Sequence, residues 1–115
     1  MTTDYSICME HGVVTIVINA KFFSMKKYLE DLRRTVGASQ PTKMIVRLNK
    51  IPLKPALMLQ QEECLPDIRW CAIVVPRANK AWEKIFRGMA QRKPHVKMAM
   101  FSDDTQVAHF LETAK

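Results

Sequence analysis

Apolar residues between positions 68 and 101 follow two different periods. Residues 68–75 form a largely apolar run whose length and β-branched content predict a strand buried on both faces. The next apolar residues recur at the spacing of one helical face, at Trp82, Ile85, Phe86 and Met89. A second apolar run follows at 96–101. Strand, helix and strand within this span predict a βαβ unit, in which the two strands are parallel.

The first forty residues predict a hairpin followed by a helix. Residues 5–9 alternate between apolar and polar, and the β-branched run 13–18 follows a short turn that contains Gly12, so we expect an antiparallel hairpin. Ser24 is expected to be the N-cap of a helix that Gly37 ends. The residues expected on its buried face are Met25, Tyr28, Leu29, Leu32 and Val36.

Three further elements follow from the remaining sequence. Residues 43–48 predict a third strand, and the proline that begins the segment at about 55–64 suits the first turn of a short helix. Ser102 or Asp103 is expected to cap a last helix. The residues expected to face inward in that helix are Val107, Ala108 and Leu111.

The resulting order, β-β-α-β-α-β-α-β-α, predicts one domain. The chain has 115 residues, of which 48% are hydrophobic and 25% charged, a composition typical of a globular protein with a sizeable core. We expect a single domain over residues 1–115 with an α/β fold. Its five-stranded mixed sheet would begin with an antiparallel N-terminal hairpin and continue with parallel strands, with about four helices packed on it.

Positive charge is concentrated in one segment of the chain. The formal net charge is +7, and the only acid among the basic residues of 77–97 is Glu83. This segment is either a solvated polar face or a docking surface for an acidic protein, a phosphorylated ligand, a lipid head group or nucleic acid. Nucleic acid is the weakest candidate, because no recognised binding motif is present and the aromatic residues have core spacing. The basic residues are Arg77, Lys80, Lys84, Arg87, Arg92, Lys93 and Lys97.

Several classes of protein are disfavoured by what the sequence lacks. No apolar run approaches the roughly 20 residues that cross a membrane, and residues 1–10 lack the regions of a secretory signal, so we expect a cytoplasmic protein without a membrane span. The cysteines Cys8, Cys64 and Cys71 form no C-x-x-C pair, which disfavours a disulfide framework or a zinc site. Each cysteine is expected to be a small buried apolar residue.

The sequence also contains no catalytic or metal-binding constellation. His11, His95 and His109 fall on separate predicted elements, so no pair has metal-ligand spacing. The neighbouring acids Glu62 and Glu63 would not face each other on a helix. The three glycines are isolated, which disfavours nucleotide binding of the Walker or Rossmann kind. We therefore expect a protein that is not an enzyme and holds no metal or cofactor.

Five stretches, taken in order, are similar to the elements of a known family. Residues 10–16 would be its opening hairpin, 44–48 its central strand and 68–75 its fourth strand. Residues 96–104 would be its last strand, leading into a closing helix at 107–111. In this order they resemble the STAS domain family (sulfate transporter and anti-sigma factor antagonist), especially its small stand-alone bacterial branch, over nearly the whole chain.

The STAS resemblance implies a regulatory, non-enzymatic domain that binds protein partners or small anionic or apolar ligands. The best-known members are switched by phosphorylation of a Ser or Thr at the start of the second helix. The matching segment here, 49–56, contains neither residue, and the stretch in which members often carry an Asp is Val-Arg-Leu-Asn at 46–49. The usual kinase-controlled anti-sigma mechanism is therefore not expected.

Two loops are candidate binding sites, because open α/β sheets bind ligands beyond the carboxyl ends of their parallel strands. Side-chain charge and helix N–H donors in these loops would favour an anionic group. The second loop could equally be an ordinary strand-to-helix turn in which an asparagine only caps the helix. The candidate residues are Asn49, Lys50 and Lys54 in the loop at 49–55, and Arg77, Asn79 and Lys80 in the turn at 76–80.

We expect a regulatory module that docks a protein partner on the loop at 49–56, the short helix that follows it and the turn at 76–80. The alternative is a small carrier or sensor that binds an anionic or amphipathic molecule, such as a lipid, in a pocket of roughly 300 Å³ or more. Eight methionines and the aromatic pair Phe22 and Phe23, both expected to be exposed, could line such a groove, although most methionines are expected in the core. A homodimer through a strand edge or a helix face is left open.

Overall fold

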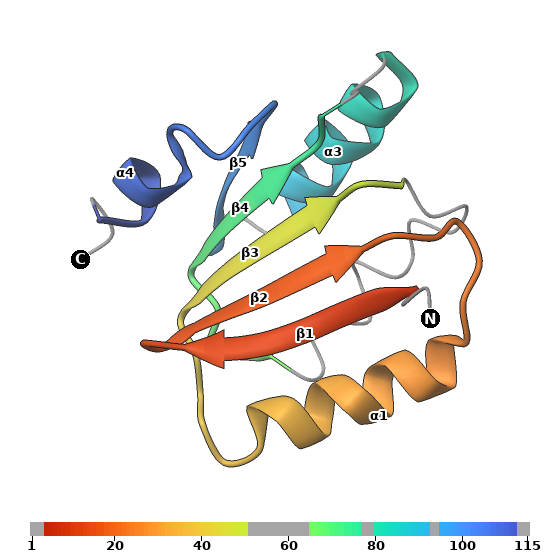
Figure 1. The fold of residues 1–115 in the computed structure, drawn as a ribbon. Helices are drawn as coiled ribbons and strands as arrows, with labels where there is room; N and C mark the ends of the chain where they lie inside the picture. Colours follow the sequence, from red (N-terminus) through yellow and green to blue (C-terminus); the bar gives the residue numbers. More distant parts are fainter. Residues whose placement is uncertain (1–3, 51–64, 77–79, 93–94, 113–115) are drawn as a thin grey trace.

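The computed structural model describes residues 4–50, 65–76, 80–92 and 95–112 (Figure 1). Its five strands pair in chain order, the first two antiparallel and the rest parallel. This confirms the predicted α/β fold with a mixed sheet and an N-terminal hairpin. Three helices are described, and the further helix predicted at about 55–64 lies outside the described residues. The elements are β1 (Tyr5–Glu10), β2 (Val13–Ile18), α1 (Met25–Val36), β3 (Lys43–Leu48), β4 (Trp70–Val74), α3 (Lys80–Arg92), β5 (Lys97–Phe101) and α4 (Val107–Glu112).

A two-residue turn joins β1 to β2. Glu10 pairs with Val13, and the intervening His11 and Gly12 have φ angles of 52° and 77°. Two successive positive φ values are those of a type I′ turn, whose twist matches the twist of the paired strands. The turn therefore sets the register of the hairpin, which runs without interruption from Glu10 to Tyr5.

Both predicted ends of α1 are confirmed. The Ser24 Oγ accepts a hydrogen bond from the Lys27 backbone N–H at 3.2 Å, which makes Ser24 the N-cap. Gly37 follows the last turn with a φ of 56°, and its N–H donates to the Arg33 carbonyl at 2.8 Å. These two contacts satisfy backbone groups that the helix leaves unpaired at its ends.

One core lies between the sheet and the helices α1 and α3. Its buried members come from alternate positions of β2, β3 and β4, together with Tyr28 and Leu32 of α1, and Phe86 of α3 packs against them. Both helices lie on the same face because each connects neighbouring parallel strands in the same direction, and such crossovers share one hand. Figure 1 shows α1 running alongside β1, with α3 and α4 on different sides of β4.

The other face of the sheet is covered only in part. Val107 and Leu111 of α4 pack on Ala72 and Val74 of β4 in a second, smaller core. Phe110 adds ring contacts at centroid distances of 5.6 Å to Trp70 and to Phe101. Over β1 the same face is open, because Ser6, Cys8 and Glu10 are all exposed. We refer to this uncovered part as the open face.

The structure corrects four predictions of side-chain burial. Cys8 is exposed rather than buried, whereas Cys71 is buried as expected. Ile85 is 37% exposed, so the inward face of α3 includes Phe86 but not Ile85. Phe23 is half-buried, and Ala108 is exposed on α4.

The last helix also begins later than predicted, at Val107. The Asp103 carboxylate accepts a hydrogen bond from the Thr105 backbone N–H at 2.9 Å, within the turn that precedes the helix. A hydrogen bond with the Thr105 side chain, followed by this backbone bond, lowers the pKa of Asp103. The side chains of Trp82 and Met89, which were expected on the buried face of α3, lie outside the described part of the structure.

A cluster of three rings attaches α1 to β1. Tyr5, Phe23 and Tyr28 contact one another at centroid distances of 5.2–5.6 Å. The Tyr5 hydroxyl donates a hydrogen bond to the Asp31 carboxylate, which also pairs with Arg34. Partial burial, followed by the hydrogen bond to Asp31, raises the pKa of Tyr5 to about 12. Phe23 is half-buried because it fills the space between these two tyrosines.

Truncation of one valine on each face of the sheet tests whether one face is covered by helices and the other is open. Val46 is fully buried under the helices, whereas Val17 is half-buried on the open face. Val46→Ala should lower the free energy of unfolding by about 2–3 kcal/mol, because it removes buried methyl groups and leaves a cavity. Val17→Ala should lower it by about 1 kcal/mol or less. Urea denaturation of both variants measures the difference, and equal losses would show that the open face is covered.

The raised pKa of Tyr5 predicts a loss of stability at alkaline pH. The unfolded chain releases the Tyr5 proton near pH 10, its ordinary pKa, whereas the folded protein keeps it to about pH 12. The hydroxyl therefore contributes its full stabilisation below pH 10, and this contribution disappears as the pH rises through 12. The stability difference between wild type and Tyr5→Phe, measured by urea denaturation, should shrink between pH 10 and 12. A difference that stays constant over this range would contradict the assignment.

Candidate functional site

The carboxyl ends of β2, β3, β4 and β5 meet at one edge of the sheet. These strands are parallel, so the residues that follow them, beginning with Asn19, Asn49, Val75 and Ser102, lie along this edge. Figure 1 shows β2, β3 and β4 pointing the same way. Helices α1 and α3 begin at this edge, because each follows one of these strands. In an open α/β sheet this is where ligands bind.

Three of the predicted site residues are described, and all three lie at this edge. Asn49 is exposed, and its Nδ2 donates a hydrogen bond to Oδ1 of Asn19 at 2.7 Å. The Lys50 backbone N–H donates to the Ile18 carbonyl at 3.2 Å, which fixes the loop while the Lys50 side chain stays exposed. Lys80 is exposed as the first residue of α3. The other three predicted residues, Lys54, Arg77 and Asn79, lie outside the described residues.

The structure adds to this edge residues that sequence reasoning did not assign to the site. The Phe22 ring is 73% exposed in the loop between β2 and α1, as the sequence predicted, but its position beside the strand ends was not foreseen. Lys21 precedes it, and Lys26 and Lys27 occupy the first turn of α1. All three lysines are exposed. We call the set Lys21, Phe22, Lys26, Lys27, Lys50 and Lys80 the basic edge.

The lysines of the basic edge are available to a partner. Within the described part of the chain none of them forms an ion pair, since the two ion pairs there are Arg34 with Asp31 and Arg47 with Asp104. The second pair lies beside the basic edge: both Nε and Nη2 of Arg47 lie 2.9 Å from Oδ1 of Asp104. Arg47 therefore neutralises a carboxylate that follows the carboxyl end of β5.

The first turn of α1 carries charges that do not favour the helix. It contains no acidic residue but holds Lys26 and Lys27 at the positive end of the helix dipole. Ser24 is the N-cap, so Lys27 occupies the position where a glutamate would return a hydrogen bond to the Ser24 backbone N–H. The sequence thus places lysine where helix stability favours glutamate.

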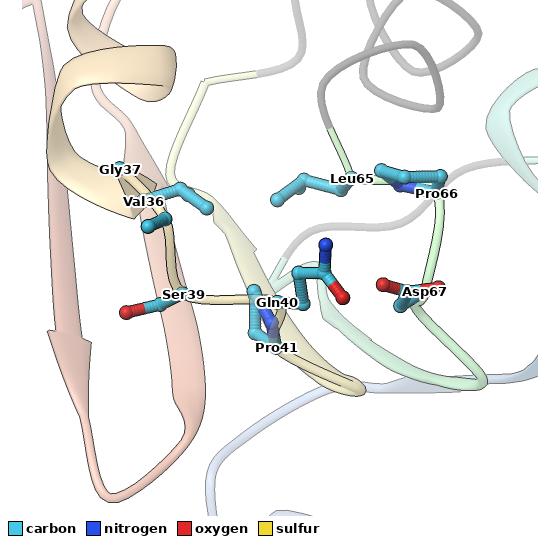
Figure 2. Close-up of a pocket in the computed structure, with 9 residues that line it drawn as sticks. Val36, Gly37, Ser39, Gln40, Pro41, Leu65, Pro66 and Asp67 are labelled. Atoms are coloured by element: carbon cyan, nitrogen blue, oxygen red, sulfur yellow. The ribbon is translucent and has the colours of Figure 1, made fainter.

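A small pocket lies at the opposite edge of the sheet (Figure 2). It has a volume of about 160 Å³ and lies between the end of α1 and the segment that leads into β4. Leu65 points into it from the side opposite Val36. This volume is about half of what we expected for a carrier, and none of the described site residues Asn49, Lys50 and Lys80 lines the pocket. Its lining residues are Val36, Gly37, Ala38, Ser39, Gln40, Pro41, Leu65, Pro66 and Asp67.

The side chains of the described residues suggest binding rather than a metal centre. In the described ranges no group of three or more His, Cys, Asp or Glu side chains is placed to hold a metal ion. None of the described helices is long and apolar enough to cross a bilayer. The groups that the edge presents are ammonium ions, one aromatic ring and the Asn19–Asn49 amide pair, which suit an anionic surface with an apolar feature.

Comparisons of the chain with known protein families, with curated proteins and with solved structures give no match. The STAS resemblance therefore stays a prediction that rests on the order and pattern of the elements.

Replacement of Lys27 tests the conflict between charge and helix stability. Lys27→Glu should raise the free energy of unfolding by about 0.5–1 kcal/mol, because it completes a capping box with Ser24 and suits the helix dipole. Lys26→Glu changes the same charge one residue earlier without the capping geometry, so its gain should be smaller. Thermal and urea denaturation measure both. A loss of stability in Lys27→Glu would show that Lys27 makes stabilising contacts in the native fold.

Proposed function

We propose that this protein is a non-enzymatic regulatory module that docks an acidic partner protein on the basic edge. The observation that carries the proposal is the 73% exposed ring of Phe22 at a sheet edge that also carries five exposed lysines without ion pairs to described residues. Covering such a ring contributes apolar binding energy, and the lysines select and steer a negatively charged surface.

The backbone around Phe22 supports a role in recognition. The Ser24 N-cap fixes the start of α1, and Phe23 is anchored against Tyr5 and Tyr28. Phe22 thus directly precedes an anchored, half-buried neighbour and a capped helix, which limits the freedom that it loses on binding. Aromatic residues on rigid elements often carry a large share of the energy at interfaces.

A protein surface suits this edge better than a small ligand does. The described pocket lies at the other edge of the sheet, so it does not support a carrier at the basic edge. An anionic bilayer is also less suited, because stable insertion needs more apolar area than one ring provides. A folded partner can combine a pocket for Phe22 with acidic residues around it.

The STAS resemblance supports a regulatory role at the same edge, because its members use the start of the second helix for switching. The segment 49–56 contains no Ser or Thr, and Arg47, close to the position where members often carry an Asp, pairs with Asp104. We therefore propose that the concentration and charge of the partner control docking, without phosphorylation of this chain. The cytoplasm is the compartment in which we expect it.

Charge reversal at the basic edge tests the proposal. An affinity pull-down from a lysate of the native host would compare three proteins: the wild type, the double variant Lys21→Glu with Lys50→Glu, and Phe22→Ala. A retained acidic protein would then be purified, and its affinity measured by calorimetry at low and high salt. The double reversal should weaken binding at least about tenfold, with a shallower salt dependence, because it removes attractive charge pairs.

A matched variant controls for the net charge. Arg33→Glu with Lys97→Glu makes the same change of four charge units at the opposite edge of the sheet, and its binding should stay close to that of the wild type. If both double variants weaken partner binding equally, then binding depends on the net charge of the protein and not on the basic edge. Unchanged partner binding by the Lys21, Lys50 and Phe22 variants would refute the basic edge as the docking site. Binding to anionic vesicles, with no protein partner retained, would show that the basic edge binds a membrane surface instead.

A further inference from the structure

The outer side of β1 is an unpaired strand edge in the described structure. β1 is the first strand of the sheet and pairs only with β2. The Asn19 N–H donates to the Asp4 carbonyl at 2.8 Å, and inward hydrogen bonds recur at every second residue of an antiparallel strand. The even-numbered residues therefore bond to β2, and the N–H and C=O groups of Tyr5, Ile7 and Met9 point away from the sheet.

Over its described length, β1 also lacks three features that commonly keep sheet edges apart. Natural edge strands are commonly interrupted by proline, lysine or a bulge. β1 contains neither residue, and its register with β2 is continuous over six pairs from Tyr5–Ile18 to Glu10–Val13. At the other border of the sheet, β5 begins with the exposed Lys97. The two edges therefore differ, and β1 is the one suited to receive another strand.

We propose that β1 pairs antiparallel with β1 of a second copy of this chain, which joins the two sheets into one of ten strands. The outward groups belong to odd-numbered residues, so odd residues must pair with odd ones across a two-fold axis. The pairing centred on Ile7 sets Asp4 against Glu10 of the second copy, two like charges. The pairing centred on Cys8 avoids this contact.

The register centred on Cys8 brings compatible side chains together. Ile7 lies opposite Met9 of the second copy, and Ser6 lies opposite Glu10. The two Cys8 side chains face each other on the open face, where each is exposed in the single chain. Directly opposed residues of this kind have Cα atoms about 4.5 Å apart, which suits a small side chain.

Helix α1 leaves room for the second copy. It follows β2 and returns along the sheet, so it runs in the same direction as β1, and the Tyr5 hydroxyl bonds to Asp31. From Tyr5 to Cys8 the strand advances about 10 Å. From Asp31 to Gly37 the helix advances about 9 Å. Helix α1 therefore ends near the level of the two-fold axis, and the two helices extend away from each other.

The proposed dimer is compatible with docking at the basic edge but does not depend on it. The two-fold axis reverses the direction of every strand. The basic edges of the two copies, which lie at the carboxyl ends of the strands, therefore face in opposite directions. Each copy could bind one partner without interference from the other. A dimer without a partner, or a partner bound by a monomer, would separate the two proposals experimentally.

Light scattering coupled to size-exclusion chromatography, over a range of protein concentrations, measures the association directly. The wild type should elute as a dimer. Cys8→Lys places two ammonium groups against each other across the axis and should weaken dimerisation at least tenfold, whereas Cys8→Ser should preserve it. Both substitutions are at an exposed position, and circular dichroism checks that the variants remain folded.

Cross-linking with the short reagent bismaleimidoethane tests the register. A Cys64→Ser protein, which retains exposed Cys8 and buried Cys71, should give a covalent dimer, and further replacement of Cys8 by Ser should abolish it. Adding Ser6→Cys to that last protein should not restore the cross-link, and restoration would show another register. A monomer at all concentrations would overturn the proposal. So would a dimer that is unaffected by Cys8→Lys and is not cross-linked through Cys8.

Discussion

The register of the three central strands determines how the rest of the molecule is built. Ile16, Val46 and Ile73 pair in one continuous row across β2, β3 and β4, and all three are fully buried under the helices. A shift by one residue in any strand would turn its apolar side chains toward the open face. The helices α1 and α3 can cover only the face that this row defines, so the other face is left for α4 and solvent.

Strands and α1 could be predicted from the sequence because their patterns are local. Alternation specified β1, and Ser24 and Gly37 specified both ends of α1. The exposure of Cys8 could not be predicted in this way, because it depends on which strand is the edge and on how much of the sheet α4 covers. Ile85 fits the helical apolar period, yet α3 packs toward the border of the sheet, where a narrower part of its surface is buried.

The candidate site was predicted in its location but not in its composition. Open α/β topology was enough to point to Asn49, Lys50 and Lys80 at the carboxyl ends of the strands. Lys26 and Lys27 could not be assigned to the site from the sequence, because residue spacing shows the face of a helix and not the edge of the sheet at which the helix starts. Both positive charges lie at the positive end of the helix dipole, where they lower the stability of the fold. Residues that serve binding often lower stability in this way.

The strand order has a consequence for how the chain is made. Each strand pairs with the one that precedes it, from β1 to β5, so a strand that leaves the ribosome finds its neighbour already synthesised. The hairpin of β1 and β2 needs only local contacts, and each later strand closes one further loop. The sheet can therefore grow during translation in the order of the sequence, and the side of the newest strand is always the growing end.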